Sequence, residues 1–121
     1  MVLWSSAGDD ESGSGFATRT VQAGEVKVAM TPQSLDPDGA RIRVAFDTHT
    51  GSLDLDPATA SQLHVNGTPA APGTWDGPAA GGHHRAGTLT FGTPIAAGAT
   101  VELRITGLST DVAATWTVTG S

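Results

Sequence analysis

The sequence predicts an all-β domain, an antiparallel immunoglobulin-like (Greek-key) β-sandwich of about seven or eight strands. Three observations predict it. Apolar and polar residues alternate with a period of two, turn signals recur at short intervals, and the composition favours strands over helices. Of the 121 residues, 16 are glycine and only 15% are charged, with little helical spacing of apolar residues. A chain of this length is expected to form one domain.

Residues 1–15 differ in composition from the rest of the chain. The stretch "AGDDESGSG" at 7–15 is acidic, small and free of apolar side chains, so it buries too little surface to offset the entropy of ordering. It is predicted to be a flexible linker or a remnant of cloning. Residues 16–121 are then the single sandwich domain, and a linker implies another domain or protein upstream as a partner.

Five stretches alternate clearly, namely "EVKVAMT", "RIRVAFDTH", "GTLTF", "TVELRIT" and "DVAATWTVT". In a strand, successive side chains point to opposite faces of the sheet, so alternate residues share one face. "FATRTV" and "SQLHV" are predicted as further strands. The residues expected to face the core are Val26, Val28, Met30, Ile42, Val44, Phe46, Leu89, Phe91, Val101, Leu103, Ile105, Val112, Ala114, Trp116 and Val118.

Turn signals separate these stretches. They are "DPDG" at 36–39, "HTGS" at 49–52, "VNGTP" at 65–69, "APG" at 71–73 and "AAGAT" at 96–100. A short helical turn is predicted only at "DPATAS", where Asp56 can cap the turn and Pro57 can take the first helical position.

Charge and composition exclude several classes of function. Six basic residues against 12 acidic ones leave a net charge of −6, which repels nucleic acid and anionic membranes. The chain has no cysteine, which excludes disulfides, thiolate catalysis and blue-copper sites. No apolar run is long enough to insert into a membrane. Any metal ion must therefore be held by His, Asp and Glu.

Three of the four histidines lie at predicted strand ends. His49 ends one strand on its outward face, and His83 and His84 precede another, behind two glycines. Histidines with nearby carboxylates suit copper(II) or zinc. Adjacent residues of an extended chain point in opposite directions, so His83 and His84 can share an ion only if the chain bends between them. The candidate metal-binding residues are His49, His83, His84, Asp47, Asp54 and Asp56.

Each of these residues also has a simpler interpretation. Histidines at strand ends are often solvated or hydrogen-bonded, and aspartates in turns often cap them. The aspartates do not follow the spacing of an EF-hand calcium loop. His64 lies within a predicted strand and is interpreted as surface-facing. Trp75 is predicted to lie in a polar turn, "PGTWDGP", and to pack over the sandwich end, with exposure for stacking on a sugar as its alternative.

A pattern in residues 40–92 resembles small exported bacterial and archaeal domains of uncharacterised function. It comprises a strand ending in Asp-Thr-His, a Leu-Asp pair, a Trp, Gly-Gly-His-His and a Gly-x-Leu-x-Phe strand. In this chain it falls on "DTHTGSLDLD", Trp75 and "GGHHRAGTLTF". The resemblance implies an exported sandwich with a shared site that includes His49, His83 and His84. It implies no reaction.

Two functions from different classes follow. The first is an exported domain that binds copper(II) or zinc through the histidines at one end, with an aspartate as an oxygen ligand or orienting an imidazole. The second is an immunoglobulin-like adhesion, spacer or interaction module without a metal. An enzyme is not favoured, because no Gly-x-Ser-x-Gly elbow occurs.

Overall fold

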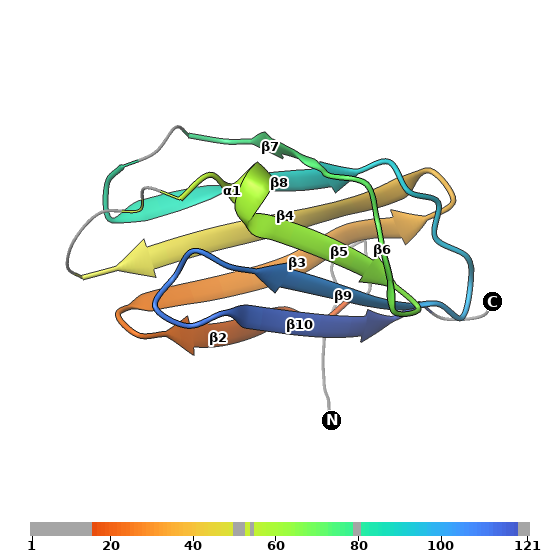
Figure 1. The fold of residues 1–121 in the computed structure, drawn as a ribbon, viewed down its shortest axis with the longest axis horizontal. Coiled ribbons are helices and arrows are strands. Elements are labelled where there is room, and N and C mark those ends of the chain that lie inside the picture. The colour runs from red at the N-terminus through yellow and green to blue at the C-terminus, as the bar shows by residue number, and fades with distance from the viewer. Residues whose placement is uncertain (1–15, 50–52, 54, 79–80, 119–121) are drawn as a thin grey trace, which may run out of the picture.

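A computed structural model describes residues 16–49, 53, 55–78 and 81–118, and these are nearly all β (Figure 1). The predicted linker at 1–15, Asp54 and residues 50–52 of the predicted "HTGS" turn lie outside the described residues. No helix in the described part is long and apolar enough to cross a membrane. The elements are β2 (Arg19–Ala23), β3 (Val26–Asp36), β4 (Gly39–Thr48), α1 (Pro57–Ala60), β5 (Ser61–Val65), β6 (Thr68–Pro69), β7 (Thr74–Asp76), β8 (His84–Phe91), β9 (Thr100–Ile105) and β10 (Val112–Thr117).

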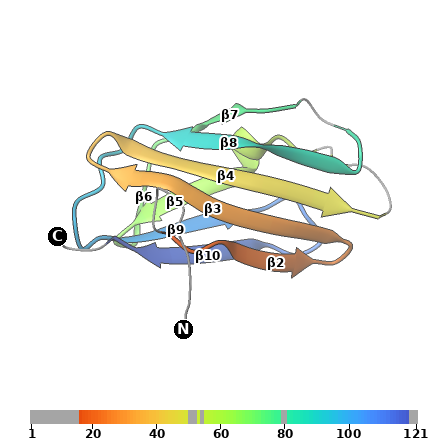
Figure 2. The same cartoon turned by 180° about the vertical axis from the view of Figure 1, so that it is seen from behind.

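The described strands form two antiparallel sheets that lie one behind the other. One has the order β2-β3-β4-β8-β7 and the other the order β10-β9-β5-β6. The four-stranded sheet is in front in Figure 1, and the five-stranded sheet is in front in the reverse view of Figure 2. The chain crosses between the sheets after β4, after β6 and after β8. The predicted all-β class and the two packed antiparallel sheets are therefore confirmed.

The core lies between the sheets and holds the residues that the alternation predicts. Of the predicted inward residues, only Val26 and Val118 are partly exposed, and both pack against the buried cluster. Burying these side chains is the main favourable term, about 1.5–3 kcal/mol for each fully buried Val, Leu, Ile, Phe or Met. Trp116 is buried and its indole Nε1 donates a 2.7 Å hydrogen bond to the carbonyl of Ala17, which ties β10 to the segment before β2.

Local signals correctly predicted the helix and the turn between β5 and β6. Asp56 caps α1 and Pro57 is its first residue, as predicted. Asn66 and Gly67 form the turn between β5 and β6 with positive φ angles of 53° and 83°, which this dipeptide tolerates. Trp75 differs from the prediction in its local structure, because it lies in the short edge strand β7, paired with Leu89 of β8, and not in a turn.

Candidate functional site at the end of β4 and β8

The site lies where β4 ends and β8 begins. In an antiparallel pair these two ends are neighbours, so residues that are 37 positions apart in sequence come together. Asp47 pairs in register with His84, and the backbone N–H of Thr48 donates a 2.9 Å hydrogen bond to the carbonyl of His83. The segments that carry three of the histidines are therefore adjacent.

Asp47 and His84 make direct side-chain contact. A carboxylate oxygen, Oδ1, of Asp47 hydrogen-bonds Nδ1 of His84 on the outward face of the five-stranded sheet. The side chains are 45% and 65% exposed, respectively, so solvent reaches both. A carboxylate bound at Nδ1 fixes the ring orientation and leaves Nε2 as the nitrogen for another partner.

The other predicted ligands are placed less closely. His49 and His83 are exposed, directly after β4 and directly before β8, and His83 stands opposite Thr48, out of phase with His84. Asp56 uses its Oδ1 to accept a 3.1 Å hydrogen bond from the N–H of Ala58. Within the described residues, no group of three or more His, Cys, Asp or Glu is arranged to hold a metal ion. Among the described candidates, the structure thus joins only Asp47 and His84 by a side-chain contact, and Asp54 lies outside the described residues.

Two glycines let the chain turn ahead of β8. Gly81 and Gly82 have positive φ angles of 113° and 79°, which glycine adopts without steric cost. Their backbone groups bind Leu53 through two hydrogen bonds. The Leu53 N–H donates a 3.0 Å hydrogen bond to the Gly82 carbonyl, and the Leu53 carbonyl accepts a 2.8 Å hydrogen bond from the Gly81 N–H. Leu53 is 1% exposed, so it is an anchor point of the segment between β4 and α1.

Arg85 is the central residue beneath this end, and the sequence analysis missed it. The residue is 2% exposed and faces inward, opposite Phe46. Its Nη1 donates to the carbonyls of Leu53 (2.9 Å) and Leu55 (2.7 Å), and its Nη2 to that of Pro78 (2.9 Å). No salt bridge to Arg85 and no partner for its buried Nε exist among the described residues. One cation thus holds three carbonyls from two segments.

The signal for Arg85 was present in its spacing. Arg85 is in phase with Leu89 and Phe91, both core residues, because positions 85, 87, 89 and 91 share one face of β8. The strand was predicted from "GTLTF" alone, two residues too late to include it. A charged residue in phase with a core face is rarely predicted to be buried, since its burial requires hydrogen-bond partners that the sequence does not show.

Trp75 packs beside Arg85, in agreement with the prediction that it packs and is not exposed. Its ring is half-buried against the core, and its edge contact with Phe46 has a centroid distance of 6.2 Å and an interplanar angle of 62°. Its Nε1 donates 3.0 Å to the carbonyl of Pro78, which Arg85 also binds. The indole therefore packs against the core beneath the β4 and β8 end.

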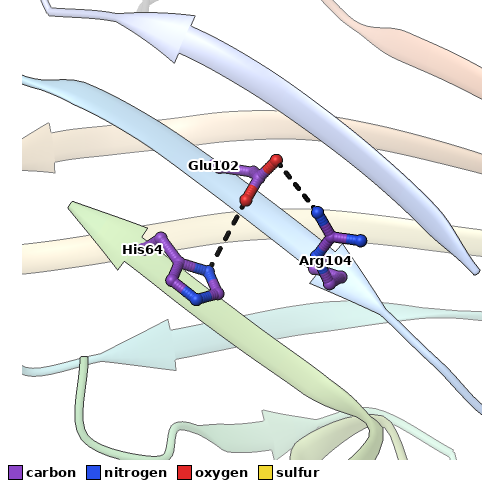
Figure 3. A network of polar contacts seen from close by, with 3 residues as sticks. All are labelled: His64, Glu102 and Arg104. Carbon is purple, nitrogen blue, oxygen red and sulfur yellow. Dashed lines mark hydrogen bonds and ion pairs between the residues drawn. The ribbon is translucent and has the colours of Figure 1, made fainter. Parts of the chain in front are cut away.

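His64 lies on the other sheet, in β5, and is half-buried (Figure 3). Its Nδ1 is 3.6 Å from Oε1 of Glu102, and Oε2 of the same carboxylate is 3.5 Å from Nη2 of Arg104. These separations are at the long end of ion pairing, and such partly exposed pairs contribute little stability. The interpretation of His64 as an outward strand residue agrees with this position.

No protein-family model, curated protein or solved structure matches this chain. The resemblance in residues 40–92 therefore stays a prediction, and the site is interpreted from its own chemistry.

Proposed function

We propose that this domain binds a divalent ion, copper(II) or zinc, at the end of β4 and β8, with Nε2 of His84 as a ligand. The contact between Asp47 and His84 supports this function. A carboxylate that holds the second ring nitrogen of a metal-binding imidazole sets its tautomer and raises its basicity. Asp47 then orients the ligand without binding the ion.

The surroundings support a cation rather than an anion. The chain has a net charge of −6, so it attracts cations to exposed donors. His49 and His83 are exposed at the same end of the sheet and supply further imidazoles. In the absence of cysteine, nitrogen and oxygen donors suit zinc and copper(II). Export and membership of the uncharacterised exported domains are part of this proposal.

An immunoglobulin-like Greek-key topology is also proposed. After the second crossing the chain returns beside an earlier strand, with β8 beside β4, and after the third crossing it does so again, with β9 beside β5. Such returns to a strand from an earlier part of the chain are typical of Greek keys in sandwiches.

Zinc titration of the metal-free protein without a His-tag tests the metal function. We expect His84→Ala to abolish saturable zinc binding and Asp47→Asn to weaken it about tenfold or more. His64→Ala is the matched control, because it removes an imidazole from the other sheet and should leave binding unchanged. The proposal would be contradicted if the parent protein showed no saturable zinc binding, or if His84→Ala and His64→Ala lost zinc affinity equally.

The alternative is an adhesion, spacer or interaction module, favoured by the hydrogen bonds of Arg85. The buried guanidinium of Arg85, which binds three loop carbonyls, is sufficient to shape this end without a metal ion. Under this alternative, saturating zinc leaves the thermal unfolding midpoint unchanged, whereas an ion bound only by the folded domain raises it.

A further inference from the structure

A groove lies away from the β4 and β8 end. It is bounded by α1 and the first residues of β5 on one side, and by the segment Ala70–Gly73 on the other. Figure 1 shows that segment on its way from β6 to β7. The groove has a volume of about 490 Å³, within the range of sites that bind small molecules. Asp47 and His84 do not line it, so its function is independent of the metal site.

Most of the groove is apolar. Small side chains of α1 and of residues 70–73 form its walls. Phe91 of the opposite sheet also lines it, but is only 1% exposed and offers a ligand little surface. Alanine side chains leave room there that leucine or phenylalanine would fill. An apolar body of modest size therefore gains contact with these walls and loses contact with water.

One cationic side chain at the groove has only a weak partner. Arg104 lines the groove and its side chain is 44% exposed. Its contact with Glu102 is 3.5 Å, too long for a strong hydrogen bond, so the guanidinium is free to bind a further carboxylate.

We propose that this groove binds a small apolar carboxylate. The apolar body packs on the small side chains of α1 and of residues 70–73, and the carboxylate pairs with the guanidinium of Arg104. Gln62 is the cross-strand neighbour of Arg104 and also lines the groove, so its amide is placed to donate beside it. Free organic acids and the C-terminal carboxylate of a peptide share this chemistry.

Amide-detected NMR titration with phenylacetate tests the proposal, with neutral phenylacetamide as the matched ligand. A salt concentration near 0.15 M screens the net charge of −6, so that only local pairing counts. Phenylacetate should cause saturable shifts at the groove amides and bind about tenfold more tightly than the amide, since a charge-assisted bond is lost in the amide. No saturable shift, or equal affinity for both ligands, would overturn the proposal.

Variants distinguish the contribution of the Arg104 guanidinium to ligand binding from that of the apolar groove. Arg104→Gln should remove the preference for the acid, while Arg41→Gln, an exposed arginine on the other sheet, should retain it. Ala70→Leu fills the groove and should abolish binding of both ligands in a protein whose spectrum stays dispersed. Equal effects of Arg104→Gln and Arg41→Gln would show unspecific charge attraction and overturn the site. Tighter binding of a peptide ending in a free Phe than of phenylacetate identifies a peptide as the source, and the reverse identifies a free acid.

Discussion

The guanidinium carbon of Arg85 lies 5.8 Å from the centre of the Trp75 ring. Both residues also donate hydrogen bonds to one carbonyl, that of Pro78. A cation over an aromatic face is favourable, and more so when water is excluded. This pair joins β8 to the edge strand β7 and supports the loops at the end where Asp47 and His84 meet.

Replacing Arg85 should destabilise the domain strongly. Arg85→Met keeps the apolar stem but leaves the carbonyls of Leu53, Leu55 and Pro78 without their donors, so we expect a loss of about 3 kcal/mol of unfolding free energy. Urea denaturation measures it. Arg41→Met on the exposed face is the control, with a change of about 0.5 kcal/mol or less. Equal changes in both variants would contradict the role of Arg85.

A side chain at position 87 should displace Trp75. A Cβ on Gly87 would stand 2.8 Å from the Trp75 ring and 2.5 Å from the carbonyl oxygen of Asp76, so β7 must shift. We expect Gly87→Ala to cost about 1–3 kcal/mol and to red-shift tryptophan fluorescence as the indole becomes exposed. Gly92→Ala is the matched control, because nothing lies within 4 Å of its added Cβ. An unshifted spectrum in Gly87→Ala would show that the ring stays in place.

Asp56 should act as a helix cap and not as a metal ligand. Its side chain accepts the N–H of Ala58, so Asp56→Ala should lose about 1 kcal/mol while Asp56→Asn retains most of the stability. Chemical denaturation checks the stability, and zinc titration of Asp56→Asn checks the ligand role. Weaker zinc binding by Asp56→Asn, at unchanged stability, would restore Asp56 to the metal site.

Asn66 should stabilise its turn in two ways. It takes a positive φ of 53°, and its Oδ1 accepts a 2.9 Å hydrogen bond from the N–H of Thr100. Asn66→Ala loses both and should cost about 1–2 kcal/mol. Asn66→Gly keeps the backbone conformation and should lose less, and Asn66→Asp keeps the acceptor as well. Thermal unfolding of the three variants orders them, and equal midpoints for Ala and Asp would contradict the hydrogen bond.

Much of the fold was predictable because its signals are local. Ile42, Val44 and Phe46 alternate with polar residues, and a strand must place them on one face, whatever its partners are. Asp56 and Pro57 marked α1, and Asn66 with Gly67 marked a turn, since each acts on backbone atoms within a few residues. The candidate site was predictable only in part, as histidines at strand ends with aspartates nearby.

From the sequence alone, most of the strands, their buried faces, most of the turns and the short helix followed, because these depend on side-chain alternation and on backbone preferences of neighbouring residues. The packed fold was needed to show that Asp47 contacts His84, that Arg85 is buried beneath that end, and that α1 and residues 70–73 enclose a groove. Each of these depends on which strands pair and in which register. Register joins residues that are distant in the chain, and a single sequence carries no local signal for it.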